Sequence, residues 1–353
     1  PVWFAREQAM IWSRHWIYAG RLHDLAPMTM RRISVAGENL ILVRDRGDTV
    51  TCFHNTCRHR GSELCTSDEK PLASRLIACP YHQWSYGLDG RLVRTPFISE
   101  MPDFRKDDYG LYKVHVTLWN GSIFVCLAET PPDFSAAPDL GTQALDNWPM
   151  ADLVTGHTMV KQLACNWKVF WENYNECLHC PGIHPQLSDM VPLYAKGYMA
   201  PNEAPGWTPE SHGHEDVLKP GARTWSMNGK LCGPEFPGLR ETERAAGQTF
   251  VTLLPTMFIV AHVDYVRIVS LQPIGPEQTE LRAEWLFAAD TLARPDFDLA
   301  NTVDFATIVM LQDGAACEMN QRGLKSARHR QGRLMPQEFD VHRFHNWVRE
   351  RTD

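Results

Sequence analysis

Two short stretches of this chain bring together side chains of the types that bind redox metals. The first pairs Cys57-Arg-His59 with Cys79-Pro-Tyr-His82, which offers two thiolates and two imidazoles on two segments. Such a set can hold an iron–sulfur cluster with two Cys on one iron and two His on the other. The second, Glu176-Cys-Leu-His179 followed by His184, offers two imidazoles and a nearby carboxylate. These donors suit a mononuclear iron with open coordination positions. A chain with both sites could carry electrons and activate oxygen.

The first set is expected on turns. Cys57 to His59 lies in a loop that ends at Arg60-Gly61, where the backbone can wrap a metal group, and Cys79-Pro-Tyr-His82 is the only Cys-x-x-His in the chain. A structural zinc held by the same two Cys and two His is the alternative, and ligand chemistry alone does not separate it from a cluster. Two matched loops make a set of unconnected core residues the weakest interpretation.

The second set is expected at the end of a helix over 166–179. On such a helix Glu176 and His179 are three residues apart and share one face. Pro181-Gly182 would end the helix, so that His184 can fold back toward His179.

A carboxylate to complete this second set is expected on a long helix over 298–323. Apolar residues at three–four spacing define its buried face (Val303, Ala306, Met310 and Cys317), and Asp313 is the only charge within that stripe. A buried unpaired carboxylate is costly, so a cation beside Asp313 is the natural explanation.

The composition indicates an ordinary protein of about two domains. The chain has 353 residues and a net charge of −7, which argues against nucleic acid or an anionic membrane as a partner. No apolar run approaches the roughly 18 residues of a spanning helix, and no signal peptide is visible. Ten cysteines spread over this length do not resemble a secreted disulfide scaffold, so we expect a reduced, cytoplasmic protein.

The order of the expected elements predicts an α+β fold. Residues 32–127 have the pattern of short strands, with hairpin turns at Asp89-Gly90 and Asn120-Gly121, and the Pro-rich segment 130–138 is typical of a linker. The region 186–248, rich in Pro, Gly and Trp, is expected to form loops over a pocket. Further helices are expected at 6–18 and 336–349, and strands of an antiparallel sheet at 249–254, 258–262, 265–271 and 280–287.

Both sets are embedded in motifs that resemble one known family. Cys57-Arg-His59-Arg-Gly with Cys79-Pro-Tyr-His-Gln-Trp84 closely resembles the Rieske domain of the ring-hydroxylating and demethylating oxygenases. Asn166-Trp-Lys168, Glu172-Asn173-Tyr174 and the run from Glu176 to Pro185 resemble the catalytic domain of Rieske oxygenase α-subunits. Gln312-Asp313 with Gln321-Arg-Gly323 resembles the segment that supplies the third iron ligand in that domain.

The resemblance implies a domain plan and two cofactors. The plan has an N-terminal helical segment (1–31) packing on the catalytic domain, an all-β Rieske domain (32–130), and a catalytic domain (131–353) with an antiparallel sheet flanked by helices, of the helix-grip, START-like type. By the same resemblance Cys57, His59, Cys79 and His82 hold a Rieske 2Fe–2S cluster, whereas His179, His184 and Asp313 bind a mononuclear Fe(II). Glu176 takes the place of the bridging carboxylate that links His82 of a neighbouring subunit to His179.

The resemblance also implies an activity. Glu176 stands where many members have Asp, which is similar to the branch of glycine betaine, stachydrine, choline and carnitine oxygenases. This implies O₂-dependent monooxygenation with N-demethylation of a quaternary ammonium substrate and release of formaldehyde. An aromatic-ring hydroxylating oxygenase is the alternative. The chain has no nucleotide-binding signature, so electrons from NAD(P)H are expected through a separate flavin/iron–sulfur reductase, and the family implies a homotrimer.

Aromatic residues around the expected pocket are candidates for cation–π contact with such a substrate, although each can equally be core packing. They are Trp207, Trp225, Phe250, Phe258 and Tyr265, with His262 as a candidate polar contact. Cys177-Leu-His-Cys180 also has the spacing of a thiol redox pair, which we discount because no strand precedes it. An electron-transfer protein without a mononuclear iron is the remaining interpretation.

Overall fold

The computed structural model describes residues 2–134, 142–200, 203, 208 and 217–353. The chain divides into two compact units, one of Ala5–Phe134 and one of Pro1–Phe4 with Ser135–Asp353. The predicted boundary between residues 130 and 131 lies close to this division. No helix in the described ranges is long and apolar enough to cross a membrane.

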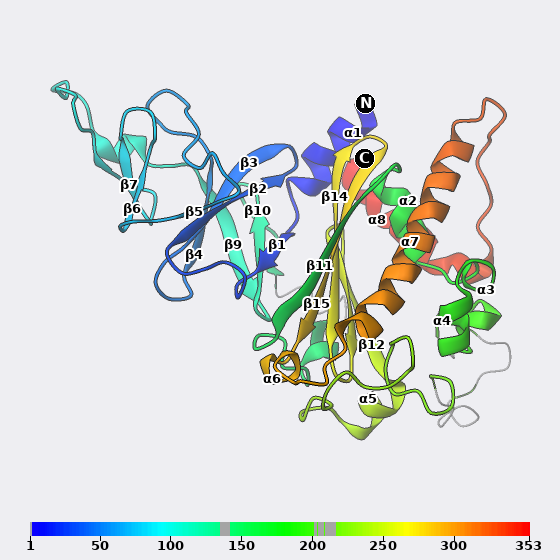
Figure 1. Cartoon of the computed structure of the whole chain (residues 1–353). Coiled ribbons are helices and arrows are strands. Elements are labelled where there is room, and N and C mark those ends of the chain that lie inside the picture. Colours follow the sequence, from blue (N-terminus) through cyan, green and yellow to red (C-terminus); the bar gives the residue numbers. More distant parts are fainter. Residues whose placement is uncertain (1, 135–141, 201–202, 204–207, 209–216) are drawn as a thin grey trace. The chain divides into compact units, whose positions relative to one another are not determined.

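The unit Ala5–Phe134 is built on two antiparallel sheets (Figure 1). One has seven strands in the order β1-β10-β9-β4-β3-β2-β5, and the other has three in the order β6-β7-β8. The predicted hairpin turn at Asn120-Gly121 is confirmed: both residues have positive φ, as a two-residue type I′ turn requires. The strands are β1 (Ile17–Arg21), β2 (Thr29–Val35), β3 (Glu38–Arg44), β4 (Val50–His54), β5 (Glu69–Pro71), β6 (Leu76–Ala78), β7 (Ser85–Gly87), β8 (Leu92–Arg94), β9 (Lys113–Trp119) and β10 (Ser122–Cys126).

The core of this unit surrounds the two cysteines of the first set. Cys57 and Cys79 belong to one buried cluster with Ile41 of β3, Phe53 of β4 and Tyr86 of β7. Side chains from both sheets therefore hold the two Cys-bearing loops against each other.

The N-terminal segment is less helical than its sequence predicts. Helix α1 (Val2–Glu7) and a π-helical turn (Gln8–Trp12) occupy part of the helix expected at 6–18, but Ile17–Arg21 form strand β1, which pairs with β10. Ile17 and Tyr18 are buried, and the Tyr18 ring packs edge-on against Phe124. Apolar burial on the sheet therefore outweighs helix formation here, and the range 1–31 contributes β1 and the start of β2 to the seven-stranded sheet.

The second unit consists of a five-stranded antiparallel sheet with helices packed against it (Figure 1). The strand order is β11-β15-β14-β13-β12, and helices α2 and α7 contact β14 and β11 respectively. Four of the strands were predicted, whereas β11 was not. The strands are β11 (Val154–Leu163), β12 (Gln248–Leu253), β13 (Met257–His262), β14 (Val266–Gly275) and β15 (Gln278–Phe287). The helices are α2 (Trp167–Tyr174), α3 (Cys180–Ile183), α4 (Pro185–Met190), α5 (Glu241–Ala246), α6 (Ala289–Leu292), α7 (Leu299–Leu324) and α8 (Phe339–Thr352).

Several short 3₁₀ turns connect these elements. They lie at Lys106–Tyr109, Thr142–Leu145, Tyr194–Lys196 and Pro336–Glu338. The region predicted as loops, 186–248, thus contains short helical pieces as well, and part of it lies outside the described residues.

Helix α7 confirms the long helix predicted near the C-terminus. The side chain of its N-cap residue, Asp298, accepts a hydrogen bond from the Asn301 backbone N–H, which satisfies one free donor of the first turn. The predicted buried face is also confirmed, since its four apolar residues, Val303, Ala306, Met310 and Cys317, are all buried.

The helix predicted at 166–179 is wrong beyond Tyr174. Helix α2 starts after Asn166, whose side chain accepts from the Lys168 backbone N–H, and it ends at Tyr174. The residues that follow form turns, in which one Glu176 carboxylate oxygen accepts from the backbone N–H groups of Leu178 and His179. These bonds replace the helical ones, so Glu176 and His179 remain neighbours without sharing a helix.

Candidate metal centres and substrate pocket

The first set of donors lies on two turns of the unit Ala5–Phe134. The loop after β4 carries Cys57 and His59, and it is closed by hydrogen bonds of the Cys57 backbone with Ser62 and Gly61. The turn between β6 and β7 carries Cys79 and His82.

This second turn owes its shape to backbone bonds on both sides of it. The Cys79 N–H donates to the Trp84 carbonyl at 2.8 Å, and the Gln83 N–H donates back to the Cys79 carbonyl at 3.1 Å. Gln83 has a φ of 63°, the left-handed conformation that reverses the chain here. The two pairs of candidate ligands therefore lie on two turns, where the sequence placed them.

The four donors form a sulfur pair and an imidazole pair. Both sulfurs are buried, and the Cys79 side chain is close enough to affect the pKa of Cys57. The rings of His59 and His82 have centroids 4.8 Å apart, and His59 also stacks on Trp84 at 4.6 Å. Burial, assisted by the nearby His82 and Arg60, lowers the pKa of His59.

The arrangement fits a two-iron cluster better than a single zinc. Nδ1 of His59 is buried without a hydrogen-bond partner among the described residues, as expected of a nitrogen whose partner is a metal ion. A zinc ion needs all four donors to converge on one point. In the described part of the chain the only group of three or more donors that converges in this way is a different one, His179, His184 and Asp313.

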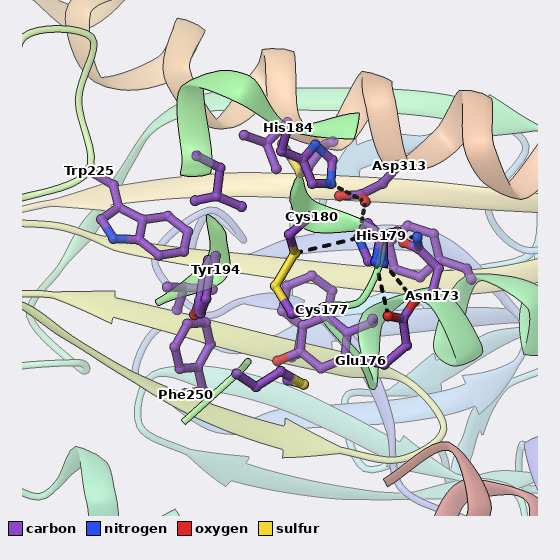
Figure 2. Close-up of a pocket in the computed structure, with 18 of the residues that line it drawn as sticks. Asn173, Glu176, Cys177, His179, Cys180, His184, Tyr194, Trp225, Phe250 and Asp313 are labelled. Atoms are coloured by element: carbon purple, nitrogen blue, oxygen red, sulfur yellow. Dashed lines mark hydrogen bonds and ion pairs between the residues drawn. A yellow bond between two sulfur atoms is a disulfide. The ribbon is translucent and has the colours of Figure 1, made fainter. Parts of the chain in front are cut away.

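The side chains of this second group come from separate elements of the second unit. His179 lies in the turn after α2, His184 between α3 and α4, and Asp313 on α7. Their candidate ligand atoms all lie within 4.8 Å of one another. Oδ1 of Asp313 lies 2.9 Å from Nε2 of His184 and 3.4 Å from Nε2 of His179 (Figure 2). Two imidazole nitrogens thus point at one carboxylate, the arrangement of a two-His, one-carboxylate metal site.

The electrostatics of this group match a site built for a cation. Burial disfavours the charged His179 ring, but hydrogen bonds with Asp313 and Glu176 outweigh it and raise the pKa of His179 to about 9. Burial also opposes ionisation of Asp313, yet the two imidazoles lower the pKa of its carboxyl group. The pocket therefore stabilises positive charge beside an ionised carboxylate. A divalent cation can supply that positive charge in place of the proton on His179.

Further side chains orient the two imidazoles. Oε1 of Glu176 lies 2.6 Å from Nδ1 of His179. Oε1 of Gln312 lies 2.8 Å from Nδ1 of His184, and because an amide oxygen only accepts, that nitrogen carries the hydrogen. In both rings Nδ1 is engaged and Nε2 faces Asp313, as expected of metal-binding histidines held by outer partners. The role of Glu176 was predicted from the sequence, whereas this contact of Gln312 was not.

A disulfide between Cys177 and Cys180 brackets the His179 turn. A thiol redox role was not assigned to this pair from the sequence, and the structure shows the two sulfurs bonded to each other. The Cys180 N–H donates to the Cys177 carbonyl at 3.0 Å, and this turn brings the two Cα atoms to 5.0 Å. Both sulfurs line the same pocket as the metal-binding candidates.

One pocket of the second unit adjoins His179, His184 and Asp313. In Figure 2, Trp225, Tyr194 and Phe250 gather on one side, and the three candidate ligands lie on the other. The rings of Tyr194 and Phe250 both stand edge-on to Trp225, each with centroids 6.1 Å away. The remaining lining residues are Phe170, Asn173, Tyr174, Glu176, Cys177, Cys180, Leu187, Met199, Phe258, Val260, Arg267, Val309 and Met310.

Three of the six residues predicted to contact substrate line this pocket, namely Trp225, Phe250 and Phe258. Tyr265 and His262 do not, because they form the layer behind Trp225. The Tyr265 hydroxyl donates to the Trp225 carbonyl at 2.7 Å, and the His262 ring stacks on Tyr265 and lies 5.3 Å from the Trp225 ring. Trp207 lies outside the described residues.

Tyr194 and Arg267 are among the lining residues that were not predicted from the sequence. Tyr194 lies in a region without hydrophobic periodicity, which gave no signal. Arg267 is the only charge in the apolar run 265–271, a signal that could have identified it.

Paired sites of this kind, one for an iron–sulfur cluster and one for a single iron, define the class of Rieske-type non-haem iron oxygenases. The comparison with protein families agrees: residues 15–105 match the Rieske [2Fe-2S] domain, and residues 150–353 match the ring hydroxylating alpha subunit (catalytic domain). The chain belongs to this family of Rieske oxygenase α-subunits. Its cofactors are a Rieske 2Fe–2S cluster and a mononuclear iron, and its co-substrate is O₂.

Comparison with individual proteins indicates which branch of the family this chain is similar to. The chain is 30% identical to the glycine betaine monooxygenase oxygenase subunit of Chromohalobacter salexigens, over 98% of this chain and 82% of that one. It is 26% identical to the carnitine monooxygenase oxygenase subunit of Escherichia coli, over 97% and 89%. The fold matches the quaternary ammonium Rieske monooxygenase CntA in complex with L-carnitine with a TM-score of 0.72 at 20% identity, covering 98% of this chain and 91% of that chain.

Proposed function

We propose that this chain is the oxygenase component of a system that removes an N-methyl group from a quaternary ammonium compound as formaldehyde. The observation that carries the proposal is a single pocket with two different ends. One end has the three converging donors His179, His184 and Asp313, and the other has the aromatic rings of Trp225, Tyr194 and Phe250. Aromatic rings attract a quaternary ammonium group without needing a hydrogen bond from it.

The proposed ligand sets are those expected from the sequence. Cys57, His59, Cys79 and His82 hold the cluster, and His179, His184 and Asp313 hold the mononuclear iron. When bound, these groups supply one-electron transfer and oxygen activation. The chain's own task at the second site is positioning: Glu176 and Gln312 fix the two imidazoles, and the pocket holds an N-methyl carbon beside them.

The overall chemistry balances with two electrons from outside. One oxygen atom of O₂ enters a C–H bond of the N-methyl group, and two electrons and two protons convert the other to water. The resulting N-hydroxymethyl group then loses formaldehyde and a proton, and the nitrogen keeps the electron pair of the broken C–N bond as a tertiary amine.

The electrons are proposed to come from NAD(P)H through a separate flavin/iron–sulfur reductase, and the chain is proposed to work as a cytoplasmic homotrimer. In this arrangement Glu176 links His82 of the partner subunit to His179. A carboxylate has about four acceptor sites, two on each oxygen. Oε2 of Glu176 already accepts from two backbone N–H groups, whereas Oε1 contacts only His179 among the described residues and retains the capacity for another donor. The proposed catalytic domain is 131–353. The proposed Rieske domain extends from 32–130 back to Ala5, because β1 and the start of β2 belong to its seven-stranded sheet.

A single-turnover experiment tests the function without knowledge of the reductase. The purified, iron-loaded protein is reduced chemically, freed of reductant, and mixed with O₂ and one of four compounds: glycine betaine, L-carnitine, choline or naphthalene. We expect formaldehyde from a quaternary ammonium compound, in an amount no greater than the mononuclear iron. A ring diol from naphthalene would instead establish the aromatic-ring hydroxylase, and the absence of any product would refute both.

His179→Ala is the control for a protein that only transfers electrons. This variant should keep the visible and EPR signals of the cluster and form no formaldehyde. Unchanged product formation in the variant would show that the proposed iron site is not where the reaction occurs.

A further inference from the structure

Arg267 is placed in the pocket by the register of three strands. Phe250 of β12 pairs with Val260 of β13, and Val260 pairs with Arg267 of β14. Residues directly opposite one another in an antiparallel sheet point to the same face. All three residues line the pocket, so the arginine side chain emerges on the face that also carries Phe250.

The guanidinium group is buried and lacks partners. Arg267 is only 4% exposed, and its Nε and Nη1 atoms have no hydrogen-bond partner among the described residues. No carboxylate in the described ranges forms an ion pair with it. Burial lowers the pKa of Arg267, but an arginine starts so high that it stays charged in a protein. A buried arginine of this kind is costly unless something pairs with it.

The carboxylates of the pocket are already engaged. Asp313 contacts His184 and His179 through one oxygen, and Glu176 contacts His179 and the backbone of its own turn. These two acidic residues are the only ones among the lining residues. The charge of Asp313 favours the charged form of Arg267, but no lining carboxylate lies within ion-pair distance of the guanidinium group.

We propose that Arg267 binds the carboxylate of the substrate, so that the pocket selects a zwitterion with a quaternary ammonium group at one end and a carboxylate at the other. This inference rests on the proposed function for its ammonium end and on Arg267 alone for its anionic end. A planar guanidinium can grip a carboxylate through two parallel N–H···O bonds, which fixes orientation as well as position. A ligand that lacks the carboxylate leaves the buried arginine unpaired, and a site of this kind rejects such analogues strongly.

The test compares binding of matched probes to the resting, iron-loaded protein by calorimetry, without reductant. There are three probes. Glycine betaine has both an ammonium group and a carboxylate, its methyl ester has the ammonium group alone, and benzoate has the carboxylate alone. Arg267→Met keeps an unbranched side chain of similar reach without the charge. Arg282→Met is the matched control, since Arg282 lies on strand β15 of the same sheet, is half-exposed and pairs with Glu284.

Glycine betaine should bind wild type and Arg282→Met alike and should bind Arg267→Met about 100-fold more weakly, as expected when one partner of a buried charge pair is removed. Binding of the methyl ester should not weaken in Arg267→Met, because the ester makes no ion pair that the variant removes. In turnover, the loss should raise the KM for glycine betaine far more than it lowers kcat. Equal binding of glycine betaine to wild type and Arg267→Met, or an equal loss for both betaine probes, would overturn the inference.

Two outcomes separate this inference from the proposed function. If wild type binds benzoate in a manner that depends on Arg267 but binds neither betaine probe, the carboxylate site stands and the quaternary ammonium substrate is wrong. If wild type binds glycine betaine and its methyl ester equally, the ammonium site stands and the carboxylate site is wrong. The second comparison needs no variant, so it remains decisive even if Arg267→Met does not fold.

Discussion

The contact between Gln312 and His184 makes a quantitative prediction about iron binding. His184 is 1% exposed, so water cannot easily replace a lost partner. Its Nδ1 donates to Oε1 of Gln312 at 2.8 Å, and the Gln312 amide nitrogen donates in turn to Oε1 of Gln186 at 3.3 Å. Gln312→Leu removes the acceptor while keeping a side chain of similar size at the surface of α7.

The expected loss follows from the burial of the imidazole. A buried donor left without a partner costs about 1–3 kcal/mol. Removing the outer partner of a metal-binding histidine typically weakens metal affinity by about 10- to 100-fold. We therefore expect Gln312→Leu to bind Fe(II) about 10- to 100-fold more weakly than wild type. Gln312→Glu keeps an acceptor and should stay close to wild type.

The assay is iron retention during dialysis against a graded series of chelator concentrations. The Rieske cluster, held by residues of the other unit, is an internal reference, because its visible spectrum should be the same in every variant. Gln186→Ala is the control, since it removes only the outer 3.3 Å contact and should change iron retention little. Wild-type retention in Gln312→Leu would refute the positioning role, and a parallel loss of iron and cluster would show general unfolding instead.

Two further predictions concern the sulfurs. Tyr86→Phe removes the hydroxyl that lies 3.1 Å from the Cys57 sulfur. A hydrogen bond to this sulfur stabilises the more negative, reduced cluster by about 1 kcal/mol. Its loss should therefore lower the midpoint potential of the cluster by about 40 mV. A redox titration followed by EPR measures it, and an unchanged potential would contradict the contact. Replacing both Cys177 and Cys180 with Ser should destabilise the catalytic unit by about 2 kcal/mol, since the loop that the disulfide closes is short. Phosphine-treated wild type should show the same lower thermal midpoint, whereas equal midpoints in all samples would mean that the bond does not form in solution.

The sequence predicts most strands and both donor sets because their signals are local. Asn120-Gly121 requires positive φ and therefore indicates its hairpin directly. The apolar stripe of α7 likewise needs only three–four spacing. Strand β11 gave no such signal: it lies at the edge of its sheet and pairs only with β15, so few of its side chains are fully buried and its pattern is polar. The strand β1 depends on a distant partner, β10, which a local pattern cannot reveal.

The wrong helix end predicted at the second site also comes from contacts that a local sequence pattern cannot reveal. The turn after Tyr174 is held by side-chain-to-backbone bonds of Glu176, which no helix propensity describes. The spacing Glu176-x-x-His179 nevertheless predicted their proximity correctly, because a helix and a compact turn both bring residues three apart together. Correct proximity therefore did not require the correct secondary structure.

Asp313 and Arg267 both illustrate the rule that a buried charge needs a counter-charge. The sequence singled out Asp313 because a lone charge in a buried stripe needs a counter-charge. Arg267 meets the same condition in the run 265–271, whose continuous apolar character indicates a strand covered on both faces. The rule could therefore have predicted that Arg267 needs an anion, but it could not have predicted where that anion lies. Only the register that aligns Arg267 with Val260 and Phe250 turns the arginine toward the pocket, where the protein's own carboxylates are already engaged.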